Sequence, residues 1–348
     1  YNRIKTDTEY DDNWSFAQAD DINSSSSSDQ TNYALAYDLK RDRYSLQLHA
    51  SKGEYDRDYY TIDAHNVYKA TLKEYALINA YAYTGGKAVL GLEYKDIEGL
   101  NHYISAWPSS PSASDYTNRA VYISNVYTIH SSTLLETNLR HDAYDAFEDK
   151  TTYKVGVKHH HSFLDGLTSA ANYYTSYDAP SAYQLANQSP TVDLLKPAYT
   201  RGYDISAGYK ERFSVTYFDT KVEDGIDYVG FWPDSGYANI EGKQKFSGLE
   251  LEGSYPLSSL NLHLSANYTH LFSYEKEDGT DLIRRAKDTF NGSIDYYTDA
   301  DTHYGIDAQY VGDRIDTDGG WPAAEVATGN YTLWNLNFGT KIMDGIDL

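Results

Sequence analysis

The chain of 348 residues contains no cysteine, which excludes disulfide frameworks, thiolate metal sites and cysteine nucleophiles. Its net charge of -22 disfavours nucleic acid as a partner, because phosphate groups require a basic surface. The sequence has no run of about 20 apolar residues, so helical membrane spans are excluded as well.

Apolar and polar residues alternate in several segments, and this pattern predicts β-strands. It is present at 44–50 and clearest at 260–268, where Leu262 and Leu264 share one face and His263 lies on the other. A transmembrane barrel turns the apolar face to lipid and the polar face to a wet lumen. A soluble sandwich buries the apolar face in a core, so alternation alone leaves both architectures open.

Short and long connections alternate along nearly the whole chain. Short turns are predicted at 40–42, 84–86, 129–131, 164–166, 209–211, 256–258 and 298–300. Long polar connections are predicted at about 10–31, 53–66, 99–117, 143–151, 178–199, 222–237, 274–285 and 313–329. This sorting predicts an all-β, up-and-down antiparallel β-barrel of roughly 16 strands with every long loop at one end. The serine run at 24–28 is predicted to be a flexible loop tip.

Tyrosine is unusually abundant, with 37 copies, many of them near predicted strand ends or in loops. Membrane barrels place tyrosine and tryptophan in girdles at both interfaces, where an apolar ring with a polar tip fits best. The alternative is that tyrosine is simply a good strand residue. The position of the tyrosines favours girdles.

Four segments between about 139 and 320 share a pattern with a known family. They are L-R-H-D at 139–142, A-N-Y-Y-T-S-Y-D-A-P at 171–180, L-K-P-A-Y-T at 195–200, and Y-A-N-I-E-G-K at 237–243 followed by F-S-G-L-E-L at 246–251. In this order and spacing they resemble the barrel of a TonB-dependent outer-membrane receptor. Ala198 stands where the family usually has Glu, and Lys243 stands near a usual Ala.

Two further segments, L-I-R-R-A-K at 282–287 and Y-V-G-D-R at 310–314, resemble the vitamin B12 (cobalamin) receptor branch. Ile283 stands where that branch usually has Pro. The resemblance implies a transmembrane barrel of about 22 strands with an N-terminal plug domain and a TonB box. Neither element is found here, and the chain stops just after a predicted turn. We therefore expect residues 1–348 to be a partial barrel domain that lacks the plug and the last strands.

The resemblance implies TonB-energised, high-affinity uptake of cobalamin by a monomer in the outer membrane of a Gram-negative bacterium. Its partners would be outer-membrane lipid, lipopolysaccharide, the ligand, and TonB through the plug. A ferric-siderophore or haem receptor is the first alternative, and a passive porin or a soluble β-rich adhesin is the second. No catalytic constellation is found, so we predict that the chain is not an enzyme.

Aromatic residues in the long connections are the candidate ligand contacts, because rings at a barrel mouth can grip the apolar faces of a large ligand. They are Tyr103, Trp107, Tyr183, Phe231, Trp232, Tyr237 and Trp321. The alternative is that they belong to the upper girdle or pack loop against loop. An aromatic or cationic mouth would favour a siderophore receptor.

Carboxylates are dense in the first long connection, and oxygen-rich clusters of this kind suit Ca2+. The candidate ligands are Asp7, Asp11, Asp12, Asp20 and Asp21. Cobalamin receptors bind calcium in extracellular loops near the start of the barrel, so the resemblance implies structural Ca2+ and no redox cofactor. A solvated acidic loop without a metal is the alternative.

Overall fold

The structure is a computed structural model of the whole chain, and it describes residues 1–9, 24–61, 64–106, 110–230, 234–298, 302–318, 324–343 and 346–347. Nearly all of the described residues lie in antiparallel β-strands, which confirms the predicted fold class. In this part of the chain, no helix is long and apolar enough to cross a membrane.

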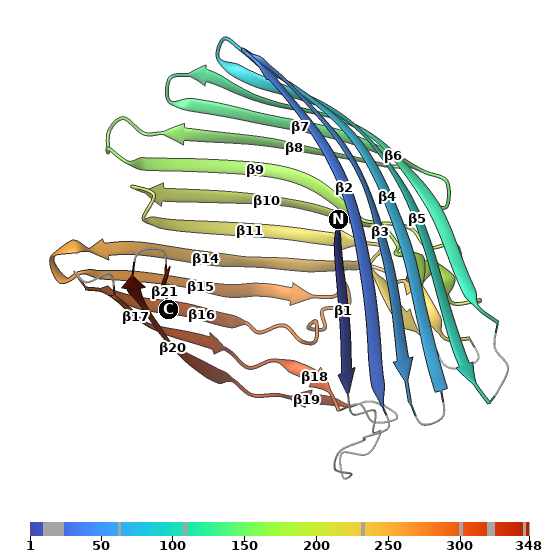
Figure 1. Cartoon of the computed structure of the whole chain (residues 1–348). Helices are drawn as coiled ribbons and strands as arrows, with labels where there is room; N and C mark the ends of the chain where they lie inside the picture. Colours follow the sequence, from blue (N-terminus) through green and yellow to red (C-terminus); the bar gives the residue numbers. More distant parts are fainter. Residues whose placement is uncertain are drawn as a thin grey trace.

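One large sheet contains 17 strands, close to the predicted number, and its strands pair in chain order. They are β1 (Asn2–Glu9), β2 (Ser25–Arg41), β3 (Tyr44–Tyr60), β4 (Ala64–Tyr83), β5 (Gly86–Ser105), β6 (Ser112–His130), β7 (Thr133–Tyr144), β8 (Lys150–His160), β9 (Leu167–Asp178), β10 (Ala198–Tyr209), β11 (Phe213–Glu223), β14 (Lys243–Leu257), β15 (Leu262–Glu275), β16 (Asp288–Tyr297), β17 (Thr302–Val311), β20 (Tyr331–Met343) and β21 (Ile346–Asp347). The sheet curls so that β1–β6 form one wall and the later strands form the opposite one (Figure 1). Among the described residues, no pairing joins β1 to β20 or β21.

The long connections hold the remaining small elements. These are α1 (Ala182–Ala186), the hairpin of β12 (Ile226–Val229) and β13 (Gly236–Asn239), and the hairpin of β18 (Ile315–Thr317) and β19 (Glu325–Ala327). A single turn of 3-10 helix, η1 (Ser258–Leu260), closes the short connection between β14 and β15. The helix and both hairpins lie in or overlap connections predicted to be long, and η1 begins at the end of the short turn predicted at 256–258.

Strand register sorts apolar and polar side chains onto opposite faces. Leu264 pairs with Ile294, and Ile294 with Ile306, so these side chains form an apolar row across three strands. Ile294 is 49% exposed in the isolated chain, which is unusual for such a side chain unless lipid covers it. One residue along each strand, Ser265 and Ser293 face each other, and their hydroxyl oxygens lie 2.7 Å apart. Alternation therefore gives a lipid-facing exterior and a polar interior.

Tyrosine rings pair near the short-turn ends of the strands. Tyr83 stacks on Tyr127 with ring centroids 6.3 Å apart, and Tyr296 lies 6.4 Å from Tyr304. The Tyr83 hydroxyl donates to Asn125 Oδ1 at 2.6 Å, so its polar tip is satisfied. This arrangement agrees with the predicted girdle at that interface.

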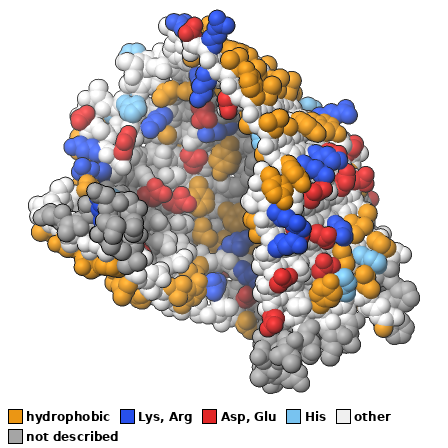
Figure 2. All heavy atoms as spheres, viewed as in Figure 1, with side chains coloured by type: hydrophobic (Ala, Val, Ile, Leu, Met, Phe, Trp, Pro, Cys, Tyr) orange, Lys and Arg blue, Asp and Glu red, His pale blue; other side chains and the backbone are white. Residues whose placement is uncertain are grey.

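Strands β2–β6 have 17 to 20 residues, whereas a tilted membrane strand needs only about 10. Beyond the apolar rows, their outer face carries ion pairs. Lys73 on β4, for example, contacts Asp96 at 2.9 Å and Glu98 at 3.0 Å. Figure 2 shows apolar side chains crowding one end of this wall and charged ones interspersed toward the other. We conclude that the long-loop ends project beyond the membrane.

Four predicted boundaries were wrong. The connection predicted at 99–117 is mostly strand, since β5 runs to Ser105 and β6 begins at Ser112. Ser25–Ser28 do not form a loop tip, because β2 runs through them with β1 on one side and β3 on the other. The predicted connection at 53–66 is mostly strand, since β3 and β4 pair as far as Tyr60 and His65. The strand predicted over 260–268 begins at 262, because Asn261 adopts a left-handed turn conformation with φ 54°.

Candidate ligand site at the mouth of the barrel

The connection at 178–199 folds inward and places α1 against β5 and β6. Ser181 and Gln184 form a capping box: the Gln184 N–H donates to Ser181 Oγ at 3.2 Å and the Ser181 N–H to Gln184 Oε1 at 2.9 Å. Gly99 provides the seat for α1, because a Cβ on Gly99 would lie 2.6 Å from Cβ of Ala182. A glycine at this position of β5 therefore lets α1 approach the wall closely.

A cavity of about 660 Å3 lies between α1 and the inner faces of β2–β5 at the long-loop end. We call it the mouth cavity. Its wall contains Ser28, Gln30, Tyr55, Arg57, Tyr59, Asn66, Tyr68, Gly99, Asn101 and Tyr183, among others.

Tyrosine rings continue from the strands of the mouth cavity to the loops. Tyr59 lies 5.6 Å from Tyr68, and Tyr68 lies 5.7 Å from Tyr183, measured between ring centroids. Tyr183 is 5.8 Å from Tyr237, which is 5.4 Å from Tyr228. These separations are typical of interacting aromatic pairs, so the five rings form one continuous surface.

Two polar side chains in the mouth cavity, Arg57 and Asn101, can form further polar interactions. Arg57 donates from Nη1 to the Tyr59 hydroxyl at 3.2 Å, and among the described residues it makes no ion pair. Lys69 differs, since its Nζ lies 2.8 Å from Asp56. Asn101 donates to Asn187 Oδ1 at 3.3 Å, but its own buried Oδ1 accepts no hydrogen bond from any residue that the structure describes. A ligand with a negative group and a donor would satisfy both residues.

Burial raises the pKa of Tyr183 and of Tyr237 above its ordinary value, and neighbouring tyrosines add to the effect. Both phenols therefore keep their protons at neutral pH. They offer hydroxyl donors together with apolar ring faces, a combination that suits a ligand with aromatic groups and oxygen acceptors.

The structure brings together two of the predicted ligand contacts, Tyr183 and Tyr237. Tyr103 follows Asn101 by two residues on β5, so it shares that face, but it is 48% exposed and does not line the mouth cavity. The other predicted contacts lie outside the described residues; they are Trp107, Phe231, Trp232 and Trp321.

Sequence reasoning missed Tyr55, Arg57, Tyr59 and Tyr68. These residues fell within or beside the connection predicted at 53–66. Positions 55, 57 and 59 alternate with acidic residues at 54, 56 and 58, which is a strand pattern with two polar faces. That alternation indicates a strand, but the strand was missed because neither of its faces is apolar.

Of the predicted calcium ligands, only Asp7 lies among the described residues. Asp7 lies in β1 opposite Ser27, on a strand rather than in a loop. Asp11, Asp12, Asp20 and Asp21 lie outside the described residues. Within the part of the chain that the structure describes, no group of three or more histidine or carboxylate side chains could hold a metal ion.

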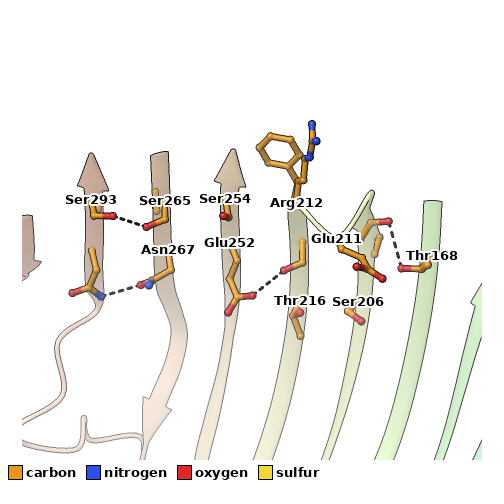
Figure 3. Close-up of a pocket in the computed structure, with 18 of the residues that line it drawn as sticks. Thr168, Ser206, Glu211, Arg212, Thr216, Glu252, Ser254, Ser265, Asn267 and Ser293 are labelled. Atoms are coloured by element: carbon orange, nitrogen blue, oxygen red, sulfur yellow. Dashed lines mark hydrogen bonds between the residues drawn. The ribbon is translucent and has the colours of Figure 1, made fainter. Parts of the chain in front are cut away.

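A second cavity, of about 950 Å3, follows the inner wall of β8–β20 toward the short-turn end. Figure 3 shows polar side chains projecting from consecutive strands into it. Asn291 donates to Asn267 Oδ1 at 2.9 Å, and Ser214 donates to Glu252 Oε2 at 3.1 Å. This lining fits a hydrated lumen rather than a specific ligand pocket.

Comparison with known families and structures agrees with this architecture. The family model described as "TonB dependent receptor-like, beta-barrel" matches residues 1–348, and the chain belongs to this family. The fold is similar to that of the siderophore receptor PirA from Acinetobacter baumannii, with TM-score 0.73 and 14% identity over 92% of this chain and 57% of that one.

Two further solved structures are also similar. The FrpB iron transporter from Neisseria meningitidis has TM-score 0.73 and 16% identity, over 91% of this chain and 56% of that one. A variant of the ferric enterobactin receptor PfeA from Pseudomonas aeruginosa has TM-score 0.69 and 15% identity, over 93% and 63%. The chain thus spans less than two thirds of the length of each protein.

Family membership confirms the predicted location, the outer membrane of Gram-negative bacteria. It also agrees with the prediction that the chain is not an enzyme, because the family consists of receptors and transporters. The resemblance to the family is confirmed, whereas the cobalamin branch stays a prediction.

Proposed function

We propose that this chain is the barrel of a TonB-driven receptor that imports an iron chelate carrying aromatic groups and negative charge, that is, a ferric siderophore. The observation that supports the proposal is the continuous tyrosine surface of the mouth cavity with Arg57 beside it. Several proteins of similar fold are named for siderophores or iron, which is consistent with this ligand class.

Each residue of the mouth cavity has a distinct role in the proposed capture step. The rings of Tyr59, Tyr68 and Tyr183 contact the aromatic faces of the ligand and exclude water. Arg57 supplies a cation to the anionic chelate, and Asn101 accepts a hydrogen bond from a ligand donor. Transport then depends on TonB, and the iron complex is the cargo of the receptor.

Cobalamin is the second candidate, and it rests on the acidic segment at 7–21, most of which lies outside the described residues. That segment would bind Ca2+ and order itself over the mouth, so calcium would tighten cobalamin and cobalamin would tighten calcium by the same factor. We further propose that the receptor works as a monomer, with the outward ion pairs of β3–β5 among lipopolysaccharide head groups. The mass of the purified receptor in detergent tests the monomer.

Binding of ferric enterobactin by the purified receptor tests the proposed ligand class. Arg57→Ala should weaken this binding by about tenfold or more, since a charge-assisted hydrogen bond contributes about 1.5–3 kcal/mol. Arg57→Lys should retain part of the affinity. Lys158→Ala instead removes a cation from the second cavity, along the inner wall of β8–β20, and it should have little effect on the binding of ferric enterobactin. Calcium-dependent binding of cobalamin, without binding of ferric enterobactin, would contradict the proposal.

A further inference from the structure

Two long connections of the barrel are interlocked at the mouth. We call them the α1 loop (179–197) and the β12–β13 loop (224–242), the latter described except at 231–233. The backbone N–H of Ser189 donates to the Tyr237 carbonyl at 3.0 Å, and the N–H of Tyr237 donates to the Asn187 carbonyl at 3.0 Å. Ser189 Oγ also donates to the Asp234 carbonyl at 2.8 Å, and Ser189 is only 1% exposed. A buried polar side chain satisfied across two loops indicates a specific junction.

Asn239 completes this junction with a single side chain. Its Nδ2 donates to the Lys196 carbonyl at 2.9 Å and to the Asp224 carbonyl at 2.7 Å, and its Oδ1 accepts from the Lys196 N–H at 2.8 Å. The side chain therefore serves three backbone groups drawn from both loops. The adjacent Leu195 has no exposed surface, so the α1 loop is anchored by burial at the same point.

Contacts between this loop pair and the barrel wall are made by side chains of the α1 loop. The side-chain hydrogen bond from Asn101 to Asn187 is long, at 3.3 Å, and Ala182 packs closely on Gly99. Tyr183 also contacts Tyr68 of β4, through their rings and a side-chain hydrogen bond. Backbone hydrogen bonds thus join the two loops directly to each other, whereas the α1 loop meets the wall through side chains, which suits a preassembled unit.

We propose that Asn239 is a positioning residue for the mouth cavity: it ties the two loops into one body and thereby holds Tyr237 against Tyr183 and Tyr183 against Tyr68. This inference rests on the proposed function, in that it assigns the ligand to the mouth cavity. Its physical basis is preorganisation, because rings that are already ordered cost the ligand less entropy on binding. Asn239 itself does not line the cavity, so it acts through the tyrosines.

The first test is a double-mutant cycle with ferric enterobactin as the probe. Asn239→Ala and Tyr183→Ala should each weaken binding by about tenfold, in keeping with one lost aromatic or hydrogen-bonded anchor. If Asn239 acts through Tyr183, the double variant should be little worse than Tyr183→Ala alone. Full additivity of the two effects would overturn the proposal. Asn267→Ala, which removes a lumenal asparagine, is the matched control and should bind normally.

A second variant provides a pH signature that a general loss of structure would not give. Asn239→Asp at neutral pH turns a carboxylate toward the Lys196 and Asp224 carbonyls, so it should bind ferric enterobactin less well than the parent does. Protonation at acidic pH restores one donor. Its affinity relative to the parent should therefore recover as pH falls, while that of Asn239→Ala should not. Equal pH profiles for the two variants would count against the proposed hydrogen bonds.

Loop order can also be measured without any ligand. The chain has no cysteine, so a spin label at Leu194→Cys, a position 56% exposed, reports only on the α1 loop. Adding Asn239→Ala should increase the mobility of this label, and adding Asn267→Ala should not. Unchanged mobility would overturn the inference. If the parent receptor does not bind ferric enterobactin, the proposed function fails, yet the spin label still decides whether Asn239 joins the loops.

Discussion

Successive residues along each strand determine which face of the sheet contacts lipid and which contacts water in the lumen. Leu264, Ile294 and Ile306 form an outward row, while Ser265 and Ser293 point to the lumen one position away. Because the side-chain period is two, a register slip by one residue would expose hydroxyls to lipid. Alternation therefore fixes both the register and the orientation of the sheet in the membrane.

This orientation predicts unequal costs for the same substitution at adjacent positions of β16. Ile294→Arg puts a cation into lipid and should destabilise the barrel by about 2–4 kcal/mol. Ser293→Arg reaches the hydrated lumen and should cost much less. Refolding titrations into lipid vesicles measure both variants. Equal costs would contradict a lipid-facing exterior.

A single ion pair also makes one loop sensitive to pH. Arg284 donates to Asp316 Oδ1 at 2.8 Å, and the Thr317 N–H donates to the same oxygen at 2.8 Å. These bonds lower the pKa of Asp316, with the Arg284 hydrogen bond as the larger cause. A carboxyl group with a lowered folded pKa stabilises the β18–β19 hairpin above its unfolded pKa, about 3.9, and this stabilisation is lost as pH falls further.

We therefore expect a spin label at Val326→Cys on β19 to gain mobility as the pH falls below about 3.9. Arg284→Ala should leave the label more mobile at neutral pH and reduce the change on acidification, because the pKa of Asp316 then returns toward its ordinary value. An unchanged acid response in Arg284→Ala would show that the ion pair does not order the hairpin.

At the scale of elements, the sequence predicts the meander well. Turn residues such as Gly85, or Lys210 and Glu211, mark the short connections, since these positions adopt positive φ. Strand ends were predicted less well. The strand segments at 53–60 of β3 and 64–66 of β4 carry polar side chains on both faces because they lie beyond the membrane, and such segments resemble a loop in sequence.

The sorted connections predict the topology of the barrel in the cell. Cysteines placed at Leu194 and Asp278 in the long connections should react with a membrane-impermeant maleimide on intact cells. A cysteine at Asp165, in a short turn, should react only after the outer membrane is permeabilised, since barrels of this type keep short turns on the periplasmic side. The absence of native cysteine gives a clean background. Labelling of the Asp165 position alone would invert the topology.

At the scale of the whole molecule, the candidate site could not be derived from sequence. The mouth cavity joins residues as distant as Arg57, Gly99 and Tyr183, which depend on the curl of the sheet and the inward fold of α1. Sequence reasoning identified Tyr183 and Tyr237 because they lie in loops that any barrel mouth must expose. It offered no reason to pair them with Tyr59 and Tyr68, since those tyrosines meet them only through tertiary packing.

Net charge over the whole chain predicts how an anionic ligand approaches. The chain carries -22, so it should repel an anionic chelate at long range even though Arg57 attracts it at contact. Raising ionic strength from 0.01 to 0.15 M shortens the Debye length from about 30 to about 8 Å and screens that repulsion.

We therefore expect the association rate of ferric enterobactin with the receptor to rise several-fold over this range of salt. The association rate of a neutral ligand such as cyanocobalamin should not rise with salt, because the net charge of the chain does not repel a neutral molecule. Stopped-flow binding measures the association rates of both ligands. The Arg57→Ala variant distinguishes the contact made by Arg57 from the long-range approach of the ligand. It should release the ligand faster, while the salt dependence of its association rate should stay unchanged. An association rate that falls with salt would mean that a local positive field, rather than the total charge, guides the ligand to the mouth cavity.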